Sequence, residues 1–299
     1  MSEIKSVAVA GASGTLGPHV LKALIDANFQ VTVLTRAAKP GAYDTSVKVV
    51  EVDYTSVDSL TAALKGIDAL VSAVGHGATE SQTILIDASV AAGVKRFIPS
   101  EYGSVSTNSK LETFPIYAPM FKIKHYLQEK AKAGKLTWTV LACGGFLEFL
   151  FGQPFLLDFA NHKANLFDEG DNRMTSTSLP NVGKAIASIL KNAKATENKI
   201  VRISEVIVTQ NGLLKIAEEV RPDIKWEISK VPTSAILKQG LDGVAAGDFS
   251  MPTVMKILTG TVAAGDTYGA AYDETDNELL GIKEFSEEDL KKLVAEKLA

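Results

Sequence analysis

Short apolar runs alternate with segments of helical periodicity along the first half of the chain. The apolar runs, many of them rich in β-branched residues, predict strands at residues 7–10, 30–36, 47–52, 69–74, 96–99 and 137–142. Between them, apolar residues recur at helical spacing over residues 18–27, 56–64, 80–92 and 119–133. Repeated strand–helix units whose strands are apolar along nearly their whole length are typical of a parallel sheet with helices on both faces. We therefore predict an α/β fold with a Rossmann-type, doubly wound parallel sheet.

The pattern loosens after Phe146. A helix at residues 180–191 and a strand at 199–204 are expected to return to the main sheet. The remaining predicted elements are helices at 209–220, 235–241, 251–258 and 286–298, a strand at 225–230, and small-residue loops at 240–247 and 260–269. We expect a main domain over residues 1–150, rejoined by about residues 176–204. Residues 151–299 are expected to form a smaller, discontinuous α/β substrate domain.

The composition carries no strong charge bias. The chain has 299 residues, of which 46% are hydrophobic and 22% are charged, and its net charge is −4. Nucleic acid is therefore not an expected partner, because no broad basic field is present. No apolar run reaches the roughly 20 residues of a membrane span, so no membrane contact is expected. Cys143 is the only cysteine, which excludes an intrachain disulfide and fits a reducing cytoplasm.

Three glycines follow the first predicted strand at the spacing Gly11-x-x-Gly14-x-x-Gly17, directly before a predicted helix. Backbone N–H groups at the start of a helix lack partners and favour an anion, and glycine lets the backbone approach phosphate oxygens closely. A strand, a glycine turn and a helix in this order are typical of a site for a dinucleotide pyrophosphate. The contacts expected from this segment come from Gly11, Ser13, Gly14, Thr15, Leu16 and Gly17.

Ligands of open parallel sheets bind beyond the carboxyl ends of the strands. The residues that follow later predicted strands are therefore further candidates for cofactor contacts. They are Ala73, Val74, Gly75, Ser100 and Gly144.

The residue at the end of the second predicted strand separates the two nicotinamide cofactors. Sites for NAD commonly place an acidic residue there, which accepts hydrogen bonds from the ribose hydroxyls. This chain instead has Arg36, followed by Lys39, with no carboxylate before Asp44. A guanidinium pairs with a 2′-phosphate, whereas a carboxylate would repel it. The sequence therefore predicts NADP(H) as the cofactor.

Several segments together resemble the NmrA-like and isoflavone-reductase-like family of atypical short-chain dehydrogenases. They are residues 11–17, Arg36, Val52-Asp53, residues 96–103 (Arg-Phe-Ile-Pro-Ser-Glu-Tyr-Gly) and residues 138–146. The resemblance implies an NADP-binding Rossmann domain, with Asp53 among its cofactor contacts, and a smaller substrate domain over a cleft. Catalytic members reduce phenylpropanoid-type or isoflavonoid-type aromatic substrates, and other members bind the nucleotide as redox sensors or regulators.

The proton donor stays open among three residues. The Tyr-x-x-x-Lys motif of ordinary short-chain dehydrogenases is broken, because Tyr117 has Phe121 at the lysine position. The resemblance implies a lysine near the start of the helix after the fifth strand, and that position falls on Met120. Lys122 and Lys124 lie close by. Glu101 is a candidate to orient a lysine or a ribose, or to form an ion pair across the cleft.

Two functions follow from these candidates. The first is an NADPH-dependent reductase of a small apolar, aromatic substrate, with Tyr102, Phe146, Phe149 and Phe151 at the substrate. The second is a non-catalytic NADP(H)-binding sensor that acts through a protein partner. Both a monomer and a homodimer are compatible with the sequence.

Overall fold

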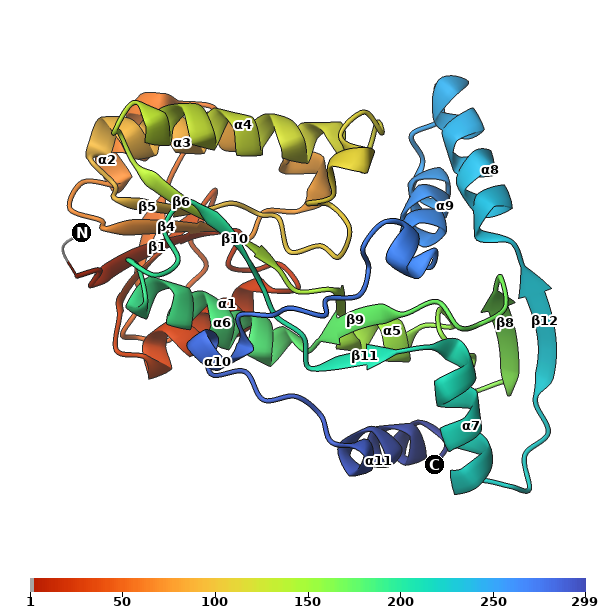
Figure 1. Ribbon diagram of the computed structural model, residues 1–299. Helices are drawn as coiled ribbons and strands as arrows, with labels where there is room; N and C mark the ends of the chain where they lie inside the picture. The colour runs from red at the N-terminus through yellow and green to blue at the C-terminus, as the bar shows by residue number, and fades with distance from the viewer. Residues whose placement is uncertain (1–2) are drawn as a thin grey trace.

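A seven-stranded parallel sheet forms the centre of the protein in the computed structural model, which describes residues 3–299 (Figure 1). Its strands in spatial order are β10 (Lys199–Arg202), β6 (Thr137–Ala142), β5 (Arg96–Ile98), β4 (Ala69–Ser72), β1 (Ser6–Ala10), β2 (Gln30–Thr35) and β3 (Lys48–Glu51). Every neighbouring pair is parallel. The predicted fold class is confirmed, and the strand expected at residues 199–204 returns to this sheet beside β6.

Helices cover both faces of the sheet (Figure 1). One face carries α1 (Gly17–Asp26) and α6 (Leu179–Lys191), and the other carries α2 (Val57–Ala63), α3 (Gln82–Ala92) and α4 (Ala118–Lys132). The two cores follow from the alternation of side chains along each strand. In β1, Val7 and Val9 join the core on the α1 and α6 side, whereas Ala8 and Ala10 join the core on the α2, α3 and α4 side.

The strand order reverses between β1 and β4. From β1 the chain builds the sheet outward through β2 and β3, and from β4 it builds outward in the opposite direction through β5 and β6. Because the connections on the two sides of this point leave in opposite directions, they open a crevice at the carboxyl ends of β1 and β4. The glycine loop after β1 and residues 73–75 after β4 border that crevice.

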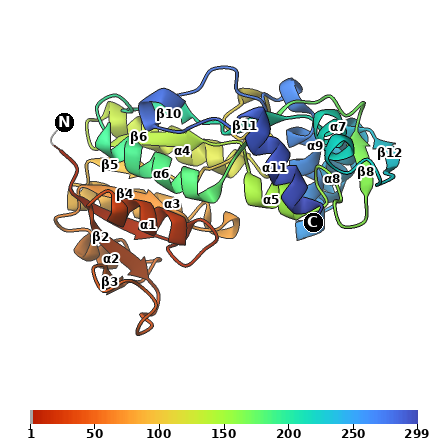
Figure 2. The same ribbon diagram turned by 90° about the horizontal axis from the view of Figure 1, so that it is seen from below.

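A second region lies at one end of the main sheet (Figures 1 and 2). It contains the sheet β11 (Val206–Val208), β9 (Met174–Thr177) and β7 (Gly145–Phe146), and the pair β12 (Glu227–Val231) and β8 (Lys163–Phe167). Its helices are α5 (Leu147–Gly152), α7 (Gln210–Val220), α8 (Thr233–Ala245), α9 (Met251–Val262) and α11 (Glu287–Lys297). The short helix α10 (Asn277–Leu280) brings the chain back against α6. No helix within residues 3–299 is long and apolar enough to cross a membrane.

The small-residue segments at 240–247 and 260–269, which the sequence predicts as loops, lie outside the α-helices only at residues 246–247 and 263–269. Residues 240–245 continue α8 and residues 260–262 continue α9. The two helices lie side by side, and their glycines stand at the contact (Figure 1). A Cβ on Gly240 would lie 2.6 Å from Ile257 Cγ1, and a Cβ on Gly260 would lie 2.6 Å from Leu237 Cβ. Gly240 and Gly260 therefore serve helix packing, whereas the glycines with positive φ that follow α8 and α9 lie in turns.

Substitution of Gly260 by Ala should lower the free energy of unfolding by about 1–3 kcal/mol, because the added methyl group meets the backbone of Leu237 and forces α8 and α9 apart. Chemical denaturation measures this loss. Gly152→Ala is the matched control, since nothing lies within 4 Å of a Cβ at that position. Equal stability of the two variants would contradict the proposed role of Gly260.

Candidate functional site

The glycine loop is held against β4 by contacts that leave no room for side chains. Gly11 has a φ of +84°, and a Cβ on it would lie 2.4 Å from the carbonyl oxygen of Ala73. Gly17 is equally enclosed, with a Cβ position 2.3 Å from the carbonyl oxygen of Ala12. Gly14 differs, because its nearest neighbour, the Gly11 carbonyl oxygen, is 3.4 Å from a Cβ and the residue itself is exposed. Gly11 and Gly17 therefore shape the loop, and Gly14 leaves its outer surface open to a ligand.

The N-terminus of α1 has the properties of an anion site. Its N-cap, Leu16, gives no side-chain cap, and its first turn holds no acidic residue. Within residues 3–299, the backbone N–H groups of Thr15 and Leu16 donate no hydrogen bond. Unpaired donors at a helix start, together with the positive end of the helix dipole, favour a phosphate.

A cavity of about 350 Å³ opens between this loop and the ends of β2 and β4. It is lined by Gly11, Ala12, Ser13, Gly14, Leu34, Thr35, Arg36, Tyr43, Tyr54, Ala73, Val74, Gly75, Ala78 and Ser81. The sequence-predicted residues Gly11, Ser13, Gly14, Arg36, Ala73, Val74 and Gly75 are thus brought together. Among residues 3–299, no carboxylate lies within 4.0 Å of the Arg36 guanidinium, so its charge is available to an anionic ligand.

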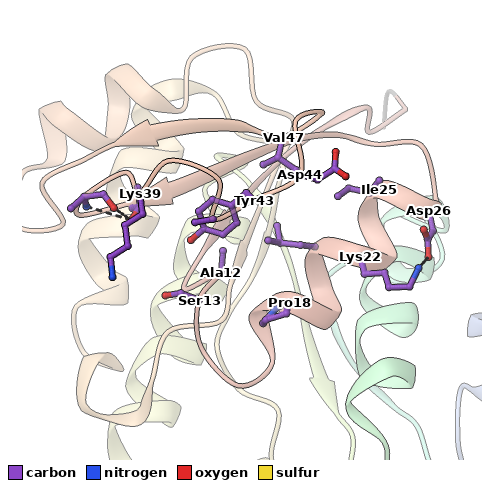
Figure 3. A pocket seen from close by; sticks show the side chains of 14 residues that line it. Ala12, Ser13, Pro18, Lys22, Ile25, Asp26, Lys39, Tyr43, Asp44 and Val47 are labelled. Carbon is purple, nitrogen blue, oxygen red and sulfur yellow. Dashed lines mark hydrogen bonds and ion pairs between the residues drawn. The ribbon is translucent and has the colours of Figure 1, made fainter.

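A second cavity, of about 510 Å³, adjoins the first on the side of α1 (Figure 3). The two share Ala12, Ser13, Thr35 and Tyr43. Figure 3 shows Tyr43 over Ala12 and Ser13, with Lys39 on one side and the ion pair of Lys22 and Asp26 on the other. Each cavity has the size of a typical ligand pocket, and Arg36 lines the first and Lys39 the second.

Two tyrosines of this site were missed in the sequence. Tyr54 donates a hydrogen bond from its hydroxyl to the carbonyl oxygen of Leu34 at 2.8 Å, which fixes its ring beside the end of β2. Burial raises the pKa of Tyr54 to about 12, so it stays neutral. Tyr43 lies in the loop between β2 and β3 and lines both cavities. Neither position belongs to a local motif, so the sequence carries no signal for either.

Three of the predicted cofactor residues make contacts within the protein that account for their positions. The Asp53 carboxylate accepts hydrogen bonds from the backbone N–H and the hydroxyl of Thr55, and it lines neither cavity. Ser100 donates its hydroxyl to the carbonyl oxygen of Val74 at 2.7 Å. Gly144, with a φ of +73°, is buried, and a Cβ there would lie 2.3 Å from the carbonyl oxygen of Thr175. Asp53 thus shapes the turn before α2, Ser100 braces the loop after β4, and Gly144 allows close packing against β9.

The two candidate lysines point to different sides of α4. Residues two apart on a helix are separated by about 200°, so Lys122 and Lys124 cannot share a face. Lys122 is exposed, and its Nζ lies 3.7 Å from Glu80 Oε1. Lys124 is buried, and its Nζ lies 3.9 Å from the centre of the Phe121 ring. Burial lowers the pKa of Lys124, and the charges of Glu101 and Glu112 offset part of that shift.

Glu101 lies in the loop that follows β5, near enough to Lys124 for each charge to act on the other. Its side chain is 4% exposed, and its Oε1 has no hydrogen-bond partner among the described residues. The buried hydroxyl of Ser106 beside it is also without a hydrogen bond in that part of the chain. Burial raises the pKa of Glu101 to about 7, although the Lys124 charge and the Ser106 hydroxyl act in the opposite direction. A carboxylate and an ammonium are thus enclosed together at the carboxyl edge of the sheet.

Tyr117 lies outside this pair. Its ring is in the core of the second region, and its hydroxyl is 2.6 Å from Thr261 Oγ1 on α9. Thr261 in turn donates to the carbonyl oxygen of Ile257 at 2.8 Å, so the Tyr117 hydroxyl is the donor between the two. The hydroxyl proton of Tyr117 is therefore engaged in a hydrogen bond that links the start of α4 to α9.

Of the four predicted substrate residues, two are engaged within the protein and two are at least partly exposed. Tyr102 donates its hydroxyl to the carbonyl oxygen of Ser72 at 2.8 Å, and Phe151 is buried against Phe159 in the second core. Phe146 is half-buried, and Phe149 is 42% exposed. Phe146 follows the carboxyl end of β6 after three residues, so these two aromatic rings remain candidates for an apolar wall.

The family model described as the NmrA-like family matches residues 3–293. The chain belongs to the NmrA-like family. This confirms the resemblance carried by residues 11–17 and 96–103. A relative of this NmrA-like protein, the oxidoreductase aprR of Aspergillus flavus, is 31% identical over 281 residues, which cover 92% of this chain and 94% of that protein.

Two further similarities are to another relative and to a solved structure. The isoflavone reductase homolog IRL of Zea mays is 27% identical over 257 residues, covering 80% of this chain and 81% of the relative. The solved structure described as AtPrR2 with NADP+ and (+)pinoresinol has a TM-score of 0.77 at 20% identity and covers 99% of this chain and 100% of that one. The structural likeness shows a shared fold over the whole chain.

The Glu101 carboxyl should make stability fall as the pH rises. Its pKa of about 7 in the folded protein exceeds the ordinary value of 4.5, so the folded state holds this proton more tightly than the unfolded chain. The resulting stabilisation is complete below pH 4.5 and is lost as the pH rises through 7, by up to about 3 kcal/mol. Thermal unfolding between pH 4.5 and 8 should show wild type losing stability relative to Glu101→Gln. A stability difference between wild type and Glu101→Gln that does not change with pH would contradict this prediction. Glu80→Gln, which removes an exposed carboxyl group, is the control.

Proposed function

We propose that this protein is an NADPH-dependent reductase of a small apolar, aromatic substrate, with Lys124 as the proton donor. The observation that carries the proposal is the burial of the Lys124 side chain on α4. This helix follows the carboxyl end of β5, and the crevice that would hold the nucleotide opens at the same edge of the sheet. The relatives that are named oxidoreductases and isoflavone reductase homologues support the reaction class.

The residues around the crevice fit NADP(H). The exposed backbone at Gly14 and the unpaired N–H groups of Thr15 and Leu16 suit the pyrophosphate. Arg36 and Lys39 suit the 2′-phosphate, which is the group that distinguishes NADP from NAD. The complex of a structural neighbour with NADP+ supports this assignment.

Substitution of Arg36 by Ala should weaken NADPH binding by about tenfold to a hundredfold, because a charge-assisted hydrogen bond contributes about 1.5–3 kcal/mol. NADH affinity should change little, since NADH has no 2′-phosphate. Fluorescence titration of both nucleotides measures the two effects. An equal loss for NADPH and NADH would refute the pairing of Arg36 with the 2′-phosphate.

When bound, NADPH supplies the hydride that reduces a carbonyl, a conjugated double bond or a benzylic ether. Charge then develops on a substrate oxygen, and a donor must hold a proton ready for that atom. Lys124 meets this requirement because it is enclosed and its pKa is lowered toward the working range of a general acid. Lys122 is exposed beside Glu80, and the Tyr117 proton is bound to Thr261.

Substitution of Lys124 by Met should lower turnover by about a hundredfold or more and spare NADPH affinity, since general acids contribute factors of about 10²–10⁴. Lys122→Met is the matched control on the same helix and should retain turnover. NADPH oxidation with aromatic enones, ketones and benzylic ethers measures both variants. Loss of turnover in Lys122→Met alone would move the role to Lys122.

The same assay separates the two functions that the sequence leaves open. Turnover of any member of the substrate panel supports a reductase. Tight NADP(H) binding with no turnover of any member would instead favour a nucleotide sensor that acts through a protein partner.

A further inference from the structure

Glu101 stands out among the buried charged groups because part of its carboxylate has no partner. Fully buried polar groups in folded proteins are normally hydrogen-bonded, and each exception calls for an explanation. The Oε1 of Glu101 and the hydroxyl of Ser106 are both buried and both lack a hydrogen bond among residues 3–299. By comparison, the guanidinium of Arg96, which is also fully buried, donates to the hydroxyls of Thr137 and Thr139 and to the carbonyl oxygen of Ala193.

The charged group that faces Glu101 is Lys124. The two come from different elements, the loop after β5 and the second turn of α4, and each acts on the charge of the other. Their amino and carboxylate groups do not form an ion pair within 4.0 Å, so the Lys124 ammonium keeps its donors available. A neighbouring carboxylate in a buried setting favours the charged form of a lysine that burial would otherwise neutralise.

A second carboxylate, Glu112, also faces Lys124, but its position is different. Glu112 is half-exposed, and its Oε1 lies 3.6 Å from Nε2 of His125. Solvent screens the effect of an exposed charge far more than that of a buried one. Glu101 is therefore the carboxylate with the larger influence on Lys124, in agreement with the order of their effects on the lysine.

We propose that Glu101 is a positioning residue for the reduction, whose buried and unpartnered carboxylate stabilises the ammonium group of Lys124. This inference rests on the proposed role of Lys124 as the proton donor. In that role the proton leaves Lys124 Nζ for the substrate oxygen as hydride arrives at carbon. Glu101 itself takes no part in bond making; it holds the negative charge that favours return of a proton from solvent to the neutral amine.

The experiment measures the pKa of Lys124 directly, by heteronuclear NMR of protein carrying ¹⁵N at the lysine side chains. The Lys124 signal is assigned by its loss in Lys124→Met. In Glu101→Gln the pKa of Lys124 should fall by about one unit or more, because the carboxylate that favours the ammonium is gone. Glu101→Asp should restore part of the shift. Glu80→Gln, which removes the exposed carboxylate beside Lys122, should leave the Lys124 signal unchanged.

The pH profile of kcat for NADPH oxidation provides the second readout. In Glu101→Gln its basic limb should move to lower pH by the same amount as the NMR pKa, which is about a tenfold loss of rate for each unit on that limb. An unchanged Lys124 pKa in Glu101→Gln would overturn the proposal, and so would a shifted pKa with an unmoved basic limb. If wild type turns over no substrate, the proposed reductase function fails, while the NMR titration still decides whether Glu101 acts on Lys124.

Discussion

The close approach of Gly11 to the carbonyl group of Ala73 is the constraint on which the site depends. A Cβ at Gly11 would lie 2.4 Å from that oxygen, and the positive φ of Gly11 turns the chain directly after the end of β1. The turn brings the start of α1 to the place where the strand order reverses. The unpaired N–H groups, the two adjoining cavities and the cations of Arg36 and Lys39 all follow from that placement.

A second constraint is the burial of charge at the same edge of the sheet. Enclosing Glu101 and Lys124 costs solvation free energy, and a neighbour of Lys124 on the buried face of α4, Leu127, is apolar. Buried ionisable groups with perturbed pKa values are enriched at functional sites, which is why this pair enters the proposed function. The exposed Lys122, only two residues away, shows that α4 itself does not require the burial of a lysine.

The regular part of the fold could be predicted because its pattern is local. The strand at 7–10 is apolar throughout and the strand at 137–142 is mostly apolar, and the glycine spacing after the first marks the start of α1. The short strands β7, β8 and β9 lack such a pattern and form by pairing with distant segments, and the apolar run of β11 has only three residues. Gly240 and Gly260 misled the prediction because small residues are typical both of loops and of closely packed helices.

In the candidate site, too, residues that belong to a local sequence pattern could be predicted and residues placed by distant contacts could not. Residues fixed by the glycine loop and by the strand ends could be found from the sequence, as Arg36 and Gly75 illustrate. Tyr43 and Tyr54 could not, because tertiary contacts alone bring them to the crevice. The choice between Lys122 and Lys124 needed the orientation of α4, and the importance of Glu101 needed its burial.

The position of Lys124 in a crystal structure with NADP+ and an aromatic substrate or product bound tests the central claim most directly. The account predicts that Lys124 Nζ lies about 3 Å from a polar atom of the ligand over the nicotinamide ring. It also predicts that Arg36 contacts the 2′-phosphate. A complex in which Lys124 stays enclosed by protein and another side chain reaches the ligand above the ring would contradict it.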